Sequence, residues 1–374
     1  MITEKYNELP RPTFRWMKVN HLELPQLKAT GRQKITIQER HEGDVSVTFY
    51  EGDGKLPLGD FTGAGADSLQ EAVGQSMTGC AITGKAGGAG KVWLTYSLSQ
   101  ELPQIVGQLK ISAPENSKLE VYLTFDGDAE NGSVNLLEYV DAAEAAAVKI
   151  CKVQLHGEQV RHVEHRYARS GKNSSIDYVS AEVGSKAAIV YYKTDLTQRE
   201  GVFSSKAMYL GSRDQILDFS YWVPQEGEKT KTDILTTGAL MDTAKKYFRG
   251  TIDFLRGCKK AAGSESDICL LLSPDVHSIS LPLLLCKEDD VVGDHASSAG
   301  QIDKDMLYYL MSRGFNREGA QLIIVESNIR PVIDSLGDTD MENKVLQAVR
   351  DKMEFCRQKG DCNDKCTKRF PHLD

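Results

Sequence analysis

Apolar and polar side chains alternate along most of the chain. Between Lys91 and Leu285, short runs such as 119–125 and 217–223 carry an apolar residue at every second position. Turn-forming pairs, among them Asn131-Gly132, separate these runs. A period of two with frequent turns is typical of half-buried strands, so the pattern predicts a mainly β body. Periodicity does not separate a β-sandwich from a parallel β-helix, and no fixed-length repeat is evident.

The pattern becomes helical after Gly300. A helix is expected over 303–313, where apolar residues recur at helical spacing. Asp303 has a side chain suited to an N-cap, and Gly314 stands where a C-cap glycine belongs. The β body therefore gives way to a helical segment close to residue 300.

Further helices are predicted by the same spacing. One starts near Asn316 and is interrupted by Pro331, and a last one covers about 340–358. Inside the β body, the alanine-rich run 141–148 is helix-prone by propensity. It is the one exception expected there.

The beginning of the chain carries weaker signals. Residues 34–50 alternate and predict two strands with a turn at 42–44, and residues 67–78 favour a short helix. Three parts follow from these patterns, namely an N-terminal region (1–90), a β core (91–300), and a C-terminal helical domain with a cysteine-containing tail (301–374).

Composition narrows the class of protein. A net charge of −8 argues against nucleic acid or an anionic membrane as the main partner. The first residues lack the apolar run of a signal peptide, and the longest apolar runs, such as 322–325, are too short to span a bilayer. We therefore expect a cytoplasmic protein whose eight cysteines are reduced thiols.

A glycine-rich stretch, Gly84–Lys91, invites comparison with a phosphate-binding loop. The P-loop requires a glycine separated by four residues from its Gly-Lys pair and a hydroxyl residue after it, but Lys85 and Val92 occupy these positions. The residues that follow alternate like a strand, whereas a bound phosphate needs a helix N-terminus. We therefore predict a turn, and no nucleotide bound by this chain.

The best candidate for chemistry lies where the β body ends. An apolar run, 283–285, precedes Cys286 and the acidic residues 288–290, and His295 follows before a run of small residues. Imidazole suits iron and zinc, and thiolate suits iron–sulfur clusters. From the residues alone, a histidine that caps a turn between body and helices is the simpler interpretation.

Acidic residues around His295 could contribute to such a site. If the strand continued past Cys286, alternation would place Cys286, Glu288 and Asp290 on one face, where a thiol and carboxylates could hold ferrous iron. Asp294 could fix the second nitrogen of the His295 ring. A buried cysteine beside a solvated acidic turn is the competing interpretation, and the sequence favours it.

Two other groups of metal-ligand residues give weaker signals. His162 and His165 are spaced i and i+3 rather than i and i+4 on a helix, so we expect an exposed polar strand there. Cys356, Cys362 and Cys366 match no standard zinc spacing. These three thiols could hold zinc or a cluster, or could form a redox-sensitive tail.

Several spaced blocks together resemble the SufB/SufD family of iron–sulfur cluster assembly scaffolds. The blocks are EDDV at 288–291, the histidine followed by small residues, Gly-x-Ile-Asp at 300–303 and LYYLMSRG at 307–314. The similarity extends upstream through YFRGTI at 247–252 and LLLS at 270–273. Near the start, LPRPTFRWMKVN at 9–20 is similar to the SufD type.

This resemblance implies a fold and a role. The fold is a right-handed parallel β-helix of the SufBD core type with a C-terminal helical domain. The role is that of a non-catalytic scaffold that pairs with a SufB-type subunit and docks a SufC-type ATPase through its C-terminal helices. The histidine matching His295 faces the SufB-type subunit, where a transient iron–sulfur cluster or iron is held at the subunit interface.

Two departures from the SufB pattern favour the SufD type. The position of the SufB-type cysteine falls near Asp267, with Cys269 two residues away, and Ala296 replaces the glutamate that follows the SufB-type histidine. Two other functions remain open. One is a self-pairing scaffold that forms a homodimer, and the other is a β-helix carbohydrate-active enzyme, although no convincing cluster of acids with a base is evident.

Overall fold

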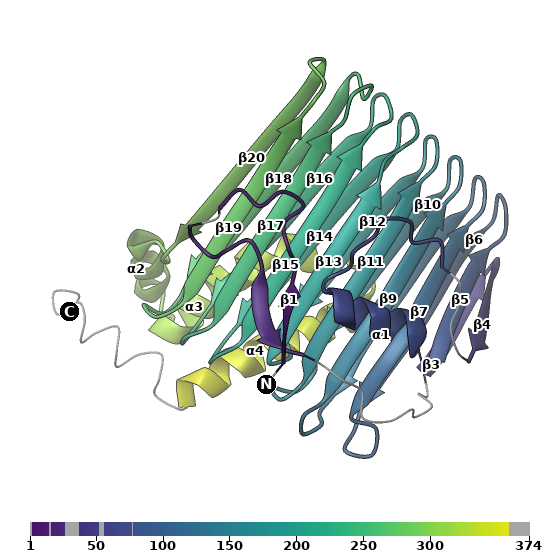
Figure 1. Ribbon diagram of the computed structural model, residues 1–374. Coiled ribbons are helices and arrows are strands. Elements are labelled where there is room, and N and C mark those ends of the chain that lie inside the picture. Colours follow the sequence, from purple (N-terminus) through teal and green to yellow (C-terminus); the bar gives the residue numbers. More distant parts are fainter. Residues whose placement is uncertain (1, 15, 27–36, 52–55, 77, 359–374) are drawn as a thin grey trace.

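Two nine-stranded sheets face each other and form a β-solenoid in the computed structural model, which describes residues 2–14, 16–26, 37–51, 56–76 and 78–358 (Figure 1). Sheet I consists, in spatial order, of β3 (Ile37–Gly43), β6 (Ala89–Leu98), β8 (Lys118–Gly127), β10 (Ala147–Gln154), β12 (Ser175–Glu182), β14 (Val202–Gly211), β16 (Lys231–Leu240), β18 (Ala261–Leu271) and β20 (Val291–Gly300). Sheet II consists of β4 (Val45–Tyr50), β5 (Thr78–Gly84), β7 (Gln104–Ala113), β9 (Ser133–Ala142), β11 (Arg161–Ser170), β13 (Ala187–Asp195), β15 (Ile216–Gln225), β17 (Lys245–Phe254) and β19 (His277–Cys286). The other elements are β1 (Thr3–Tyr6), β2 (Leu22–Pro25), α1 (Ala66–Gly74), α2 (Lys304–Ser312), α3 (Arg317–Ile333) and α4 (Thr339–Gln358).

From β5 onward, successive strands alternate between the two sheets, and each pairs in parallel with the strand one turn away. Paired residues lie 26 positions apart at Arg161 and Ala187, and 32 apart at Lys245 and His277. This variation in turn length hides the repeat from a sequence search. The expected mainly β, parallel β-helix fold is confirmed, as is the strand pair within 34–50, where β3 and β4 join at Asp44.

The lumen between the sheets is packed rather than hollow. Aromatic side chains on neighbouring strands stack in rows, as between Tyr192 and Tyr221, whose ring centroids lie 4.4 Å apart. Branched aliphatic residues fill most of the remaining space. Because parallel strands keep their register, identical or similar side chains recur directly above one another and stabilise the stack.

A charged network also crosses the lumen. Lys152 of β10 lies 2.8 Å from Glu164 of β11 and 2.6 Å from Glu182 of β12. Arg166 lies 3.0 Å from Glu138 and 3.2 Å from Glu164. All of these side chains are buried. The attraction between opposite charges in each ion pair therefore offsets the cost of removing both charges from water.

The corners of the solenoid use left-handed backbone conformations. Ala145, with φ of 55°, is one of a series of corner residues at positive φ, most of them polar. It lies in the run 141–148, which was expected to be helix-prone. That expectation was wrong, because the run splits into the end of β9, a corner and the start of β10, and strand pairing on both sides overrides local propensity.

Helices α3 and α4 cover the outer face of sheet I. Their buried residues Val325, Ile329, Val345 and Val349 pack against outward-facing aliphatic residues of the central strands. The expected N-cap Asp303 is confirmed, since its side chain accepts hydrogen bonds from two backbone amides of α2. Asn316, near which the next helix was expected to start, accepts one from α3.

Pro331 does not interrupt α3, contrary to expectation. It lies two residues before the end of the helix at Ile333, where a missing N–H costs only one hydrogen bond. The adjacent Ile329 and Val332 are buried against the sheet and hold this last turn in place.

The N-terminal arm, which comprises residues 2–14 and 16–26, and α1 cover the outer face of sheet II. Tyr6, Phe61 and Tyr167 lie in their shared core. His165 of β11 joins the two layers, because its Nδ1 accepts from the amide of Ala64 at 2.8 Å and its Nε2 lies 3.0 Å from Oδ1 of Asn135. Burial lowers the pKa of His165 to about 3.

The expectation of an exposed polar strand at His162 and His165 is therefore wrong. His165 lies beneath the segment before α1, where it contacts Ala64, and His162 points into the lumen, 3.0 Å from Glu164. Both side chains are buried because sheet II is covered on both faces, which a single strand's sequence does not reveal.

Acidification should destabilise the protein through His165. Its pKa is 6.5 in the unfolded chain and about 3 in the folded one, so stability present above pH 6.5 is lost as the pH falls toward 3. Gln can donate and accept the same hydrogen bonds without gaining a proton. Between pH 6.5 and 4.5, the free energy of unfolding of His165→Gln should fall less steeply with decreasing pH than that of the wild type, by about 1.4 kcal/mol per pH unit. Thermal unfolding at several pH values measures this slope. His277→Gln, at an exposed strand end, is the control, and an unchanged slope in His165→Gln would contradict the assignment.

Candidate interface at the open end of the solenoid

The two ends of the solenoid differ in how their edges are closed. At one end the edge strands β3 and β4 have 7 and 6 residues and run antiparallel to their neighbours. At the other, β19 and β20 have 10 residues each and, within the described part of the chain, pair only with β17 and β18 (Figure 1). All of β20 except Val291 is exposed. Such long unpaired edges are available for pairing with another chain.

His295 lies in the middle of β20 and not in a turn. It pairs in register with Glu265 of β18, and paired residues on parallel strands point to the same side. Gly293, two residues earlier, faces Phe254 and Leu284 across the lumen. His295 therefore projects from the inner face of the last coil, at its open end.

Cys286 and Glu288 do not share a strand face. The favoured expectation of an acidic turn after Leu285 is met, but Cys286 is exposed and not buried as that expectation had it. The strand β19 ends at Cys286, whose exposed thiol donates to the carbonyl of Glu288 at 3.0 Å. The Glu288 carboxylate accepts from the amide of Gly257 at 2.9 Å, and backbone hydrogen bonds of this kind lower its pKa. Cys286 and Glu288 are thus held in the tight turn that leads to β20.

The turn separates Cys286 from His295. Val291 begins β20 next to that turn, and His295 follows four residues later, which corresponds to about 13 Å along a strand. The structure therefore does not bring the thiol and the imidazole together within this chain.

Asp294 lies on the opposite face of β20 from His295. Its Oδ2 accepts a hydrogen bond from Oγ of Ser264 at 2.9 Å on the outside of the solenoid. The expectation that Asp294 fixes the His295 ring is therefore not met here, because successive residues of a strand point to opposite faces.

Behind His295 lies a buried acidic pair that sequence reasoning missed. Glu265 is 1% exposed and both of its carboxylate oxygens lack a hydrogen-bond partner among the described residues. Burial, together with the nearby charge of Asp267, raises the pKa of Glu265 to about 8. Asp267 instead pairs with Lys246 across the lumen.

Gly250 makes room for this glutamate. A Cβ at Gly250 would overlap the Glu265 carboxylate from the opposite strand β17. The block YFRGTI at 247–252 thus contains a residue whose small size the site requires. The reason for a glycine at this position becomes clear only in the tertiary structure, where β17 and β18 face each other.

Arg249, in the same block, fixes the N-terminal arm. Its guanidinium pairs with Asp218 on the outer face of sheet II, and its Nε donates to the carbonyl of Val19 at 3.0 Å. Asn7 donates to the same carboxylate at 2.8 Å. The arm then continues onto β19, where Leu9 and Val19 pack against Leu281. The arm thereby supports the strand beside the open end from outside.

Other expected metal ligands remain apart. Cys362 and Cys366 lie outside the described residues, as does the side chain of Cys356 in α4. Cys269 shares the inner face of β18 with Asp267, as its spacing suggested, and is buried. Within the part of the chain that the structure describes, no three His, Cys, Asp or Glu side chains are arranged to hold a metal ion.

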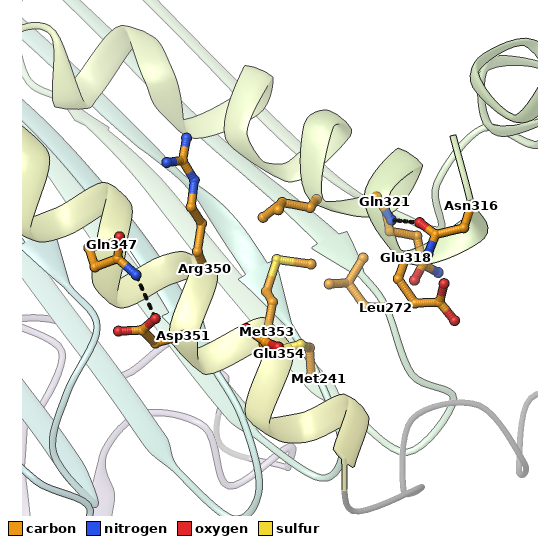
Figure 2. A pocket seen from close by; sticks show the side chains of 12 residues that line it. Met241, Leu272, Asn316, Glu318, Gln321, Gln347, Arg350, Asp351, Met353 and Glu354 are labelled. Atoms are coloured by element: carbon orange, nitrogen blue, oxygen red, sulfur yellow. Dashed lines mark hydrogen bonds between the residues drawn. The ribbon is translucent and has the colours of Figure 1, made fainter. Parts of the chain in front are cut away.

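A groove of about 420 Å³ lies between α3, α4 and the ends of β16 and β18. Figure 2 shows Met353 and Leu272 side by side within it, and Arg350 rising from α4. Polar residues of both helices, including Gln347 and Glu318, form its rim. Its mixed lining suits a protein side chain better than a charged small molecule.

Helix α2 presents a second apolar surface. Met306, Tyr308, Tyr309, Met311 and Phe315 of this helix and the loop after it are all exposed. Its inner side is anchored by Leu307, which packs with Ala320 and Ile324 of α3. An exposed group of this size marks an interaction surface.

Across the described residues, none of the helices has the length and apolar character needed to cross a membrane.

Comparisons with known proteins agree with this architecture. Residues 96–328 match the family model described as "SUF system FeS cluster assembly, SufBD core domain". The iron–sulfur cluster assembly protein SufD of Bacillus subtilis is 27% identical over 221 residues, which are 59% of this chain and 51% of that protein. A SufBD family protein of Pyrococcus horikoshii is 25% identical over 193 residues, 52% of this chain and 43% of its own.

A third relative is more distant. A SufBD family protein of Mycobacterium bovis is 21% identical over 191 residues, 51% of this chain but 23% of that protein. The matched part of this chain therefore spans about half or less of the length of these relatives. The part matched by the family model, residues 96–328, contains most strands of the solenoid, the open end and the start of α3.

Removing Arg249 should destabilise the fold strongly. Arg249→Met leaves Asp218 buried without its cation, which typically costs 3–5 kcal/mol, so we expect a loss of about that size in the free energy of unfolding. The double variant Arg249→Met/Asp218→Asn should recover part of the loss. Arg330→Met, which breaks an exposed pair with Asp334, is the control and should cost less than about 1 kcal/mol. Denaturant unfolding measures all three, and equal effects of Arg249→Met and Arg330→Met would contradict the anchoring role.

Proposed function

Because this chain belongs to the SufBD family of iron–sulfur cluster assembly proteins, we propose that it is a cytoplasmic, non-catalytic scaffold subunit of that system. In this proposal its open end pairs with the corresponding end of a SufB-type subunit, and its C-terminal helices dock a SufC-type ATPase. A nascent iron–sulfur cluster, the cargo of the complex, is built between the two scaffold subunits. The observation that carries the proposal is His295 on the inner face of an unpaired edge strand.

The open end supports pairing between chains. The edges of β19 and β20 expose backbone donors and acceptors over 10 residues each, and a second solenoid end could add its strands to both sheets. Small residues near His295, including Gly293, Ser297 and Ala299, let another backbone approach closely. Pairing would place His295 inside a joined lumen.

The chemistry of His295 fits such an interface. Its imidazole can donate one lone pair to iron, a metal for which nitrogen and sulfur ligands are suited. The described part of this chain brings no thiol beside it, so in this proposal the sulfur ligands come from the partner subunit. Cys286 ends β19, on the far side of the turn that leads to β20, and could at most contact the partner chain.

The ATPase dock is proposed on the exposed surface of α2 and the nearby groove between α3 and α4. Both lie on the helical layer, away from the lumen, and together they offer apolar side chains with a polar rim. Movement of these helices by nucleotide hydrolysis would be transmitted to β18 and β20, because α2 follows β20 directly.

Two alternative functions compete with this proposal. Self-pairing would join two copies of this open end and give a homodimer without a SufB-type chain. The other alternative is a carbohydrate-active enzyme, which activity on acidic polysaccharides would support. The buried carboxylates Glu138, Glu164 and Glu182 could not serve it, because they lie inside the packed lumen.

His295→Ala should leave the fold and the complex intact but lower cluster formation at least about tenfold. The side chain is exposed, so its loss changes little packing, whereas loss of a metal ligand removes a bond that no neighbour replaces. The measurement is anaerobic reconstitution of the complex with SufB-type and SufC-type subunits, followed by absorbance and iron counting.

Cys286→Ser and His277→Ala serve as controls for this experiment. Both change exposed side chains of β19 at the same end of the solenoid, and both should have smaller effects. A normal cluster yield from His295→Ala would refute the ligand role, and cluster formation by this chain as a homodimer would favour self-pairing.

The helical dock is best tested with surface variants. Deleting 301–374 would uncover the aliphatic outer face of sheet I and destabilise the β core, so loss of binding by such a truncation would be ambiguous. Tyr308→Ser/Tyr309→Ser changes side chains that are 74% and 54% exposed and should lower ATPase affinity at least about tenfold, as expected for aromatic hot spots. Lys344→Ser, exposed on α4, is the control. Undiminished binding in a titration of the double variant would exclude α2 from the dock.

A further inference from the structure

Glu265 is an unusual residue for its position. It lies in β18, the last strand of sheet I that is paired on both sides, is 1% exposed, and has no hydrogen-bond partner on either oxygen among the described residues. Other buried carboxylates of the lumen, such as Glu164, Glu182 and Asp267, all pair with a cation. An unpaired buried carboxyl group costs stability, so its presence at the end of the lumen calls for a functional explanation.

The register places Glu265 directly beside His295. The two residues form a Cα pair on parallel strands and point to the same inner face. Side chains on neighbouring strands are about 5 Å apart at Cβ, a distance that a glutamate and a histidine can close by rotating their side-chain torsions. Asp294 does not contact the His295 ring, because it accepts a hydrogen bond from Ser264 on the outer face.

We infer that Glu265 is a positioning residue, which accepts a hydrogen bond from one ring nitrogen of His295 and thereby directs the other nitrogen toward the open end. A neutral imidazole exists in two tautomers, and a carboxylate that accepts from one nitrogen fixes which of them carries the lone pair for a metal. Gly250 leaves the space in which the carboxyl group moves. This inference deepens the proposed function and rests on it.

The tautomer of His295 can be observed directly in the full-length chain. The protein is labelled with ¹⁵N-histidine, and the spectrum of His295→Ala identifies the ring signals of His295. In the wild type one tautomer should predominate at pH 8. In Glu265→Leu, which lacks an acceptor, the two ring nitrogens should shift toward the values of a free, exchanging imidazole.

Matched variants separate positioning from a structural effect. Glu265→Gln keeps an acceptor oxygen and should preserve the wild-type signals, as should Asp294→Asn on the opposite face. Glu265→Leu should have an unchanged or higher Tm, because it removes an unpaired buried polar group, whereas a structural role predicts a lower Tm. Gly250→Ala, which displaces the Glu265 carboxylate from the opposite strand, should also disturb the tautomer and provides a second test if Glu265→Leu does not fold.

Cluster reconstitution distinguishes this inference from the proposed function. Glu265→Leu should lower the rate of cluster formation about 10- to 100-fold, and Asp294→Asn should leave it unchanged. Identical ring-nitrogen shifts for His295 in the wild type and Glu265→Leu would overturn the inference, even if His295→Ala abolishes cluster formation. A normal cluster yield from His295→Ala would instead overturn the proposed function and leave the hydrogen bond as a structural finding.

Discussion

Hydrogen bonding between successive coils is the constraint on which the rest of this molecule depends. Each strand satisfies its backbone groups only through the coil before and the coil after it, so a solenoid of finite length must end in unpaired edges. The chain limits this problem at one end with the short antiparallel strands β3 and β4. At the other end it leaves two strands of full length, and the candidate interface coincides with them.

The same stacking explains where charge and apolar surface are placed. Side chains that point inward are held in register, so Lys152, Arg166 and their glutamates can pair across the lumen from one sheet to the other. Side chains that point outward form aliphatic or aromatic strips along the sheets, which α3 and α4 cover on sheet I and the N-terminal arm covers on sheet II. The covering layers are therefore part of the core and not independent appendages, which ties any movement of the helices to the strands beneath them.

The site combines an exposed ligand with a buried support. His295 can reach a partner because β20 is exposed at its free edge within the described part of the chain, while Glu265 and the Lys246–Asp267 pair lie one strand further in. The N-terminal arm, fixed by Arg249 and Asp218, braces β19 from outside. A partner that adds strands to this end would bury His295 and Glu265 together in a continuous lumen.

The sequence by itself determined the mainly β body, the helical segment after Gly300 and its N-cap Asp303. These features depend on period, capping chemistry and local composition, which are readable along the chain. Only the tertiary structure decided that the run 141–148 turns a corner, that His162 and His165 are buried, that Cys286 lies far from His295, and that Glu265 rather than Asp294 lies beside it. Each of these depends on which strand stacks on which, a relation between residues some 30 positions apart whose spacing varies from coil to coil.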